Sequence, residues 1–298
     1  MKKILMVAIM FTFSGVNAKT KKSTTAASPA KVETSAVSQA VEKIDTLSFA
    51  AYQSVLDKHV TEVQKPDGGF ETFVNYQKIY DDADSRKNLN DQLKLIEAFG
   101  PAKLKTKEEA LAFWINTYNC FMLSKILKDG FKDGKLSINS VKDLGGVFSP
   151  YKAFSQKDFK VGGLEMTLDE VEKGTLLGPA YKAKSWKDAR VHFAVNCASV
   201  GCPPIIKKAY TPENVNTALD ENIKRALKTK RHFNIEGDKV NVTHLAKWYK
   251  ADFVDQFGSV ARFLTKYLGD ESAIQKVKAD KYEYIEYDWK LNRAENFK

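Results

Sequence analysis

Hydrophobic residues recur at helical spacing along much of the chain, beginning with residues 47–60. This spacing places the apolar side chains on one face, so it predicts a helix with one buried side. A second helix is predicted over residues 86–99, because Gly100 and Pro101 follow it and break helical structure.

The clearest predicted helix begins after Thr106 and runs to about Lys128, before Gly130. Thr106 can accept a hydrogen bond from the first turn while Glu109, three residues later, reaches back, which is a capping box. The helix is apolar around most of its circumference, so we expect it to be buried on several sides.

Three chemically distinctive residues share one face of this helix: Asn116, Asn119 and Cys120, at spacings of three and four. A buried amide must find hydrogen-bond partners, because an unsatisfied one costs about 1 to 3 kcal/mol. The two asparagines therefore either brace neighbouring loops or line a site. We expect Cys120 to be reduced and packed.

Other segments predict short strands and helices in no regular alternation. Hairpins are expected at residues 159–166 and 233–242, helices after Thr167 and over residues 211–227, and a late strand at residues 281–289. This mixture predicts an α+β fold, with a buried central helix and further helices packed on a small, mainly antiparallel sheet.

Residues 190–204, RVHFAVNCASVGCPP, carry the candidate chemistry. Alternation predicts a strand up to Asn196, with His192 and Asn196 on one face, followed by a rigid loop holding Cys197, Ser199 and Cys202. A disulfide between the two cysteines is one interpretation, since exported proteins meet oxidising conditions.

A catalytic interpretation of the loop competes with the disulfide. Cys197 would be the nucleophile, His192 its general base, and Asn119 or Glu172 would orient the imidazole, provided that the chain turns at Asn196. Ser199 is a weaker candidate nucleophile, and a buried histidine and thiols without a special role are a further alternative. Zinc is disfavoured because no fourth ligand is visible beside His192 and the two cysteines, and we predict no metal and no cofactor.

The remaining ionisable residues suggest surface positions. His59, His232 and His244 lie among lysines and threonines and are expected to be exposed. Glu172 follows Glu170 on a short amphipathic segment, a pattern typical of a solvated acid.

The N-terminal sequence predicts export. Residues 1–18 combine two lysines, a short apolar run and small residues before a cut after Ala18, which indicates a signal peptide. Residues 19–45 are rich in Ser, Thr, Ala and Lys and predict a disordered linker. No later linker is evident, so residues 46–298 are expected to form one globular domain, periplasmic or secreted.

Composition and charge narrow the function classes. The 298 residues are 43% hydrophobic and 11% aromatic, enough for a folded core. The net charge is +10, but only six of the 47 basic residues are arginine, which argues against a nucleic-acid partner. No run after the leader approaches the roughly 20 apolar residues of a membrane-spanning helix.

Five sequence motifs occur in a distinctive order: VNY (74–76), EALAFWINTYNC (109–120), LDEVEKGTL (168–176), VHFAVNCASVGCPP (191–204) and YDWKLN (287–292). In this order the chain resembles the domain of unknown function 547 family of bacteria and plants, over roughly residues 50–292. The resemblance implies a pocket lined by Asn116, Asn119, Glu172, His192 and residues 197–202. Lys173 departs from the family pattern, which usually has histidine there.

Two functions follow as alternatives, because the family is named for lacking an assigned activity. The first is a thiol-type hydrolase or acyl transferase with a pocket lined by His, Asn and Cys. The second is a non-catalytic module that binds an envelope glycan or peptide and holds its thiols as a disulfide. Neither alternative identifies the small-molecule, peptide or glycan ligand, or the oligomeric state.

Overall fold

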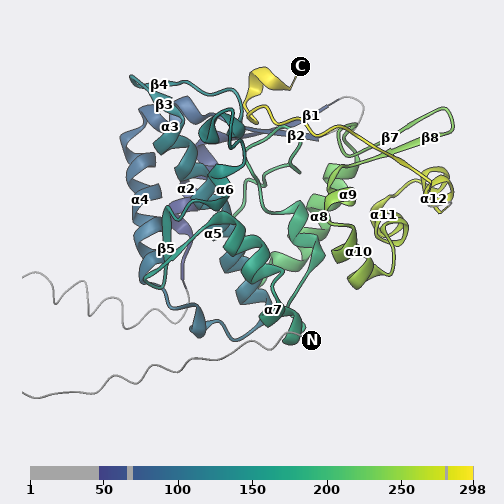
Figure 1. Cartoon of the computed structure of the whole chain (residues 1–298), viewed down its shortest axis with the longest axis horizontal. Coiled ribbons are helices and arrows are strands. Elements are labelled where there is room, and N and C mark those ends of the chain that lie inside the picture. The colour runs from purple at the N-terminus through teal and green to yellow at the C-terminus, as the bar shows by residue number, and fades with distance from the viewer. Residues whose placement is uncertain (1–46, 66–69, 279–280, 298) are drawn as a thin grey trace, which may run out of the picture. The chain divides into compact units, whose positions relative to one another are not determined.

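The computed structural model describes residues 47–65, 70–278 and 281–297. The chain divides into Met1–Glu42 and Lys43–Lys298. The described residues, which Figure 1 draws in colour, all belong to the second unit. The predicted signal peptide and linker, residues 1–18 and 19–45, lie outside the described residues.

Helices dominate the described unit. The α-helices are α2 (Ala50–His59), α3 (Tyr76–Asp81), α4 (Ala83–Ala98), α5 (Lys107–Asp129), α6 (Lys152–Ser155), α7 (Pro179–Ala183), α8 (Val215–Leu227), α9 (Leu245–Trp248), α10 (Lys250–Phe257), α11 (Val260–Tyr267) and α12 (Glu271–Val277). Single turns are the 3₁₀-helices η1 (Pro101–Lys103), η2 (Val141–Gly145), η4 (Ala189–Phe193) and η5 (Ala294–Asn296), and η3 (Glu170–Leu176) is a π-helix.

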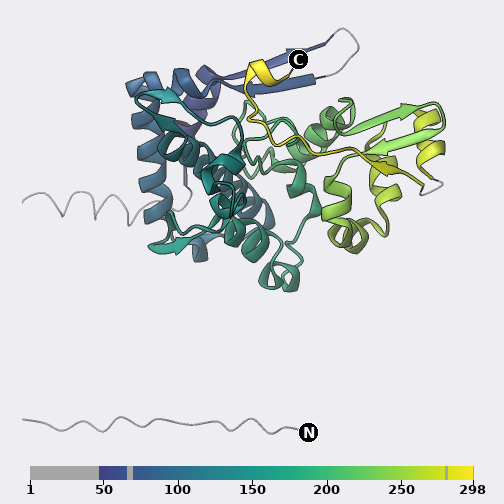
Figure 2. The ribbon, with the colours of Figure 1, turned by 45° about the horizontal axis from the view of Figure 1, so that its top comes forward.

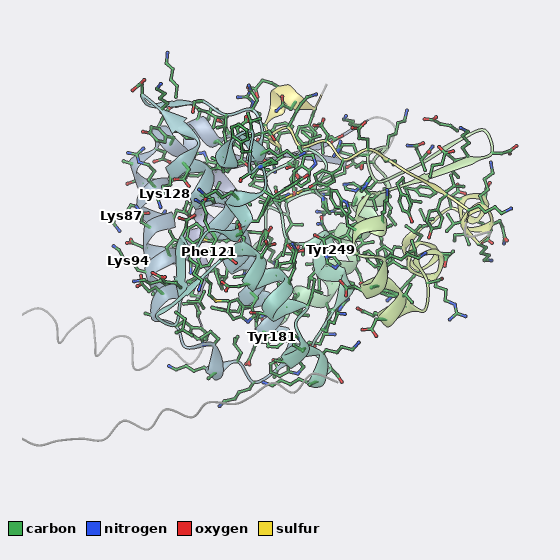
Figure 3. All side chains as sticks on the ribbon, in the orientation of Figure 1. Lys87, Lys94, Phe121, Lys128, Tyr181 and Tyr249 are labelled. Carbon is green, nitrogen blue, oxygen red and sulfur yellow. The ribbon has the colours of Figure 1, made fainter. Side chains whose placement is uncertain are left out.

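Helix α5 is the central element, as the sequence predicted. Thr106 and Glu109 form the expected capping box, and Gly130 ends the helix. Every residue from Ala110 to Ile126 is buried, because α5 packs against α3, α4, α8 and η3. In Figure 3 Phe121 of α5 lies inside, whereas Lys87 and Lys94 point outward from the exposed face of α4.

The strands form four small sheets rather than the single sheet that the pattern predicted. Three are antiparallel hairpins: β1 (Val60–Gln64) with β2 (Phe70–Val74), β3 (Phe131–Lys132) with β4 (Lys135–Leu136), and β5 (Phe159–Val161) with β6 (Leu164–Met166). The fourth joins β7 (Phe233–Glu236) to β8 (Lys239–Val242), and β9 (Glu283–Tyr284) pairs parallel to β8. The α+β class and the two expected hairpins are confirmed, but the late strand is only two residues long.

Buried apolar side chains form two clusters. The first surrounds α5, and the second is built by the elements from α8 to α12 with β7 to β9, drawn green to yellow in Figure 2. The short helix η4 lies at their junction, because Val191 belongs to the first cluster and Phe193 to the second. This junction positions the segment that carries the candidate chemistry.

The strand predicted over residues 190–196 is wrong. Residues Ala189–Phe193 form the 3₁₀-helix η4, and a loop follows. Asp188 caps this turn by accepting a hydrogen bond from the Arg190 backbone N–H, and its carboxylate also binds the Arg190 guanidinium. The alternating apolar residues pack into two different hydrophobic clusters, Val191 and Val195 into one and Phe193 into the other, so they do not lie on one face of a strand.

Within the described residues, no helix has the length and hydropathy needed to cross a membrane.

Candidate functional site

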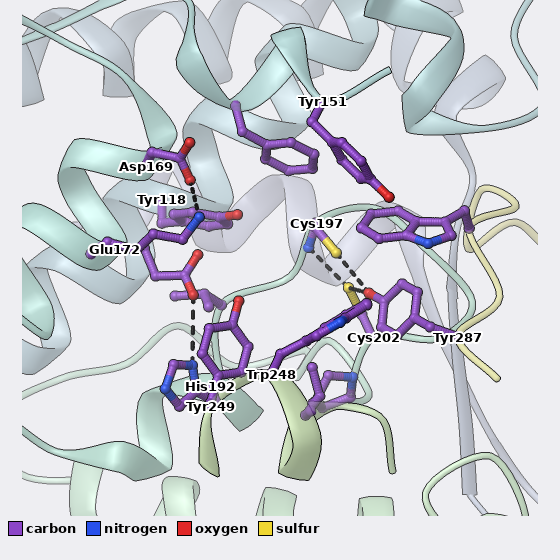
Figure 4. A pocket seen from close by; sticks show the side chains of 16 residues that line it. Tyr118, Tyr151, Asp169, Glu172, His192, Cys197, Cys202, Trp248, Tyr249 and Tyr287 are labelled. Carbon is purple, nitrogen blue, oxygen red and sulfur yellow. Dashed lines mark hydrogen bonds and ion pairs between the residues drawn. The ribbon is translucent and has the colours of Figure 1, made fainter. Parts of the chain in front are cut away.

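A cavity of about 510 Å³ opens where the two clusters meet (Figure 4). Its walls combine aromatic, acidic and thiol side chains with His192. The lining residues are Tyr118, Tyr151, Phe154, Asp169, Glu172, Lys173, His192, Val195, Cys197, Cys202, Pro203, Leu245, Trp248, Tyr249, Tyr287 and Trp289.

His192 is held between two carboxylates. Its Nε2 lies 2.9 Å from Oδ2 of Asp252, and its Nδ1 lies 3.6 Å from Oε1 of Glu172 without a hydrogen-bond partner. The Tyr249 ring stacks on the imidazole with 3.6 Å between ring centroids. A fixed imidazole whose second nitrogen faces an acid in a cavity can accept or donate a proton.

Asp252 anchors this imidazole. The hydrogen bond from His192 lowers the pKa of Asp252 to about 2, with Lys187 contributing from 2.6 Å. The ionised carboxylate favours a proton on Nε2 of His192, which leaves Nδ1 as the nitrogen facing Glu172. Asp252 was not among the predicted site residues, because nothing in the local pattern of α10 distinguishes it from the solvated acids beside it.

Glu172 is buried at 6% exposure, so the pattern typical of a solvated acid was misleading. It projects from the π-helix η3, at whose start the Thr167 hydroxyl accepts from the Glu170 N–H and the Glu170 carboxylate accepts from the Thr167 N–H. Burial and the Glu172 carboxylate raise the pKa of Tyr249, so this phenol stays protonated beside the acid. Lys173, the next residue, pairs with Asp169, with 2.6 Å between its Nζ and Oδ1 of Asp169.

The structure contradicts the predicted disulfide, because Cys197 and Cys202 are both free thiols. The Tyr287 hydroxyl contacts the two sulfur atoms, at 2.8 Å from Sγ of Cys197 and 3.0 Å from Sγ of Cys202. The backbone N–H of Cys197 donates to Sγ of Cys202 at 3.0 Å. Cys120 is also a free, fully buried thiol, as expected.

The two thiols differ in acidity. The hydrogen bond with Cys202 raises the pKa of Cys197 above its ordinary value, and burial adds to this. Burial also acts to raise the pKa of Cys202, but donors around its sulfur, the Cys197 side chain first and then Tyr287, lower it overall. The backbone N–H of Cys197 and the Tyr287 hydroxyl, each 3.0 Å from the Cys202 sulfur, favour the thiolate form of Cys202, whereas the sequence predicted Cys197 as the nucleophile.

The C-terminal segment holds the cysteine loop in place. Backbone N–H groups of Val200 and Gly201 donate to the carbonyls of Lys290 and Asp288 at 2.8 Å each. A methyl group at Gly201 would lie 2.9 Å from the Tyr287 ring, so only glycine allows this approach. The YDWKLN motif thus positions Tyr287 over the thiols, although its role was not visible in the sequence.

Three predicted site residues lie outside the pocket lining. Asn116 exchanges hydrogen bonds with the backbone of Tyr210, at 2.7 and 3.0 Å. Asn119 accepts from the N–H of Asn196 and donates to the carbonyl of Ala194, at 2.8 and 3.0 Å. Ser199 is buried and donates to the carbonyl of Cys197 at 3.3 Å. In the structure these side chains brace backbone rather than face the cavity.

The expected pairing of Cys197 with His192 does not occur among the described residues. The Cys197 sulfur binds the Tyr287 hydroxyl, and His192 binds Asp252. Figure 4 shows His192 with Glu172 on one side of the pocket and the thiols with Tyr287 on the other.

The prediction of three surface histidines is also wrong. His232 is fully buried, and burial lowers its pKa to about 3 while its ring contacts Thr243 and the carbonyl of Cys202. His59 is 7% exposed, and its Nε2 lies 2.8 Å from the Ser85 hydroxyl. His244 is half-buried against the carbonyl of Ile285. Among the described residues, no group of three or more His, Cys, Asp or Glu side chains is arranged to hold a metal ion.

The fold and pocket define an α+β protein with a buried histidine between two acids and a thiol pair on a tyrosine. Residues 101–227 match the family described as "Protein of unknown function, DUF547". The match confirms the family indicated by the motifs and includes α5, Glu172, His192 and both pocket cysteines, whereas Asp252 and Tyr287 lie beyond it. No curated protein and no solved structure matches the chain.

Proposed function

We propose that the pocket catalyses thiol-dependent acyl transfer or hydrolysis, with Cys202 as the nucleophile. The observation that carries this proposal is the environment of the Cys202 sulfur, which accepts the Cys197 N–H and contacts the Tyr287 hydroxyl, both at 3.0 Å. Such donors favour the thiolate, which is the nucleophilic form of cysteine.

In this mechanism the thiol side of the pocket supplies the nucleophile, and the side with His192 and Glu172 transfers protons. The Cys202 thiolate attacks the carbonyl carbon of a bound acyl donor, so that a C–S bond forms and the bond to the leaving group breaks. The leaving group takes a proton from the His192–Glu172 pair. Water or an acceptor hydroxyl then attacks the thioester and returns a proton to this pair, and Cys202 leaves as thiolate. Asp252 and stacked Tyr249 hold the imidazole throughout.

Thiol labelling tests the nucleophile. We expect iodoacetamide at neutral pH to modify Cys202 before Cys197, and p-nitrophenyl acetate to leave an acetyl group on Cys202, as read by peptide mass spectrometry. Cys202→Ser should abolish acylation, whereas the buried Cys120→Ala should leave it unchanged, because burial raises the pKa of Cys120. Preferential labelling of Cys197, or unreactive thiols in folded protein, would refute the proposal.

One observation favours the non-catalytic alternative. Trp248, Trp289 and Tyr151 form an aromatic wall, with ring centroids 5.8 Å apart for the two tryptophans and 5.3 Å for Tyr151 and Trp289. Such rings bind flat apolar faces, including those of sugars. Ligand binding in a Cys202→Ser variant that matches the unmodified protein, with no acylation in either, would support a glycan- or peptide-binding module.

A further inference from the structure

Two consecutive apolar side chains project into solvent beside the pocket. Val147 is 91% exposed and Phe148 is 99% exposed, at the tip of the loop that joins η2 to α6. Isolated exposed apolar residues are common on proteins, but an adjacent aliphatic and aromatic pair at a loop tip marks a contact surface. The following Tyr151, 51% exposed, belongs to the pocket lining.

The base of this loop is fixed. A Cβ at Gly145 would lie 3.2 Å from the backbone of Pro150 and Lys152, so the two ends of the loop touch. The N–H of Lys152 donates to the carbonyl of Ser149 at 2.9 Å, and Gly146 has a φ of 67°. The chain therefore holds the apolar tip outward instead of folding it onto the core.

Basic charge flanks the tip. The Lys142 ammonium lies 4.6 Å from the Trp289 ring centre and 5.2 Å from that of Tyr151, and Lys152 is exposed. Among the described residues, neither lysine forms an ion pair. The one acid between them, Asp143, accepts hydrogen bonds from the backbone of Asn139 and Ser140. An exposed apolar tip flanked by aromatic rings and by two lysines without acidic partners complements an anionic bilayer, where such side chains enter the interface and lysines meet headgroups.

We propose that residues 145–152 dock this protein peripherally on an anionic lipid surface, with the pocket mouth facing the bilayer. The loop inserts Val147 and Phe148, while Lys142 and Lys152 contact acidic headgroups. A lipid surface is the proposed partner because basic charge and exposed apolar area occur together at this loop. It does not depend on the proposed acyl transfer.

Vesicle sedimentation of the full chain tests the docking. With vesicles of phosphatidylcholine plus phosphatidylglycerol, Phe148→Ser should weaken binding about tenfold or more. Lys152→Gln should weaken it about fivefold and reduce its salt dependence. The matched control is Leu164→Ser, which removes an apolar side chain that is 73% exposed on the β5–β6 hairpin. All variants share the same N-terminal residues, so differences between them report the loop.

Three outcomes would overturn the proposal. Equal vesicle binding by Phe148→Ser and Leu164→Ser would show that the tip does not enter lipid. Loss of a dimer on size-exclusion chromatography of Phe148→Ser, without a change in vesicle binding, would make the tip an interface between copies. Equal binding to pure phosphatidylcholine would remove the role of charge. Acylation of Cys202 would be unaffected by any of these results.

Discussion

The two ring nitrogens of His192 face different acids, and this asymmetry decides what the residue can do. Asp252 binds Nε2 and is also paired with Lys187, so its charge is shared between an imidazole and an ammonium. Glu172 faces Nδ1 from 3.6 Å, inside the cavity. One acid therefore fixes the ring, while the other faces the second nitrogen from the wall of the cavity.

The anchoring acid should be visible in the pH dependence of stability. The pKa of Asp252 is about 2 in the folded protein, below its ordinary value. A lowered pKa stabilises the fold above the ordinary value, and this contribution is lost as the pH falls through about 2. We expect Asp252→Asn to lower the free energy of unfolding by about 1 kcal/mol at neutral pH, allowing for solvent screening.

The difference in free energy of unfolding between the unmodified protein and Asp252→Asn should shrink as the pH falls from about 4 to about 2. Urea unfolding at several pH values measures this difference. Asp255→Asn is the control, because Asp255 also binds Lys187 but is exposed. Asp255→Asn should change the free energy of unfolding less than Asp252→Asn does. A difference between Asp252→Asn and the unmodified protein that stays constant down to the acid limit would contradict this account.

At the scale of elements, the sequence predicted helices and hairpins correctly where the residues that form a cap or a turn lie close together in the chain. The capping box at Thr106 and the turn glycines of β5–β6 and β7–β8 act within a few residues, so the sequence indicates them directly. The alternation around His192 failed because its apolar residues enter two separate cores. The partners Asp252 and Tyr287 are 60 and 90 residues from His192 and Cys197, and no local pattern records such contacts.

The contact between the cysteine loop and the C-terminal segment predicts a coupled effect on stability and thiol acidity. In Gly201→Ala the new methyl group would meet the Tyr287 ring and the Asp288 nitrogen at 2.9 Å. We expect a loss of about 1 to 3 kcal/mol from overpacking. Displacing the Tyr287 hydroxyl should also raise the pKa of Cys202, measured as slower iodoacetamide labelling at neutral pH.

The control for this prediction is Gly100→Ala, since a Cβ at Gly100 has nothing within 4 Å. Both its stability and its labelling rate should stay close to those of the unmodified protein. If Gly201→Ala lost stability while Cys202 kept its reactivity, Tyr287 would be a packing residue, and the donors from the loop backbone alone would account for the thiolate.

At the scale of the whole molecule, the pocket is lined by residues from both hydrophobic clusters. Glu172 and His192 lie within the DUF547 match, but Asp252, Trp248 and Tyr287 come from the elements after residue 227. A segment truncated to residues 101–227 would retain α5 and the cysteine loop, yet it would lose the acid on Nε2 of His192 and the hydroxyl between the thiols. The site therefore belongs to the larger unit.

Residues 1–18, which lie outside the part of the chain that the structure describes, predict export. We propose that the chain is exported and cut after Ala18, because Lys2 and Lys3 precede a short apolar run with small residues at its end. The intact mass of protein isolated from the cell envelope should correspond to a chain beginning at Lys19. Replacing Ala18 by a bulky residue should block cleavage and leave the longer mass, whereas the matched change Thr20→Ala, beyond the cut, should not. Finding residues 1–18 still present in the native protein would overturn export by a cleaved leader.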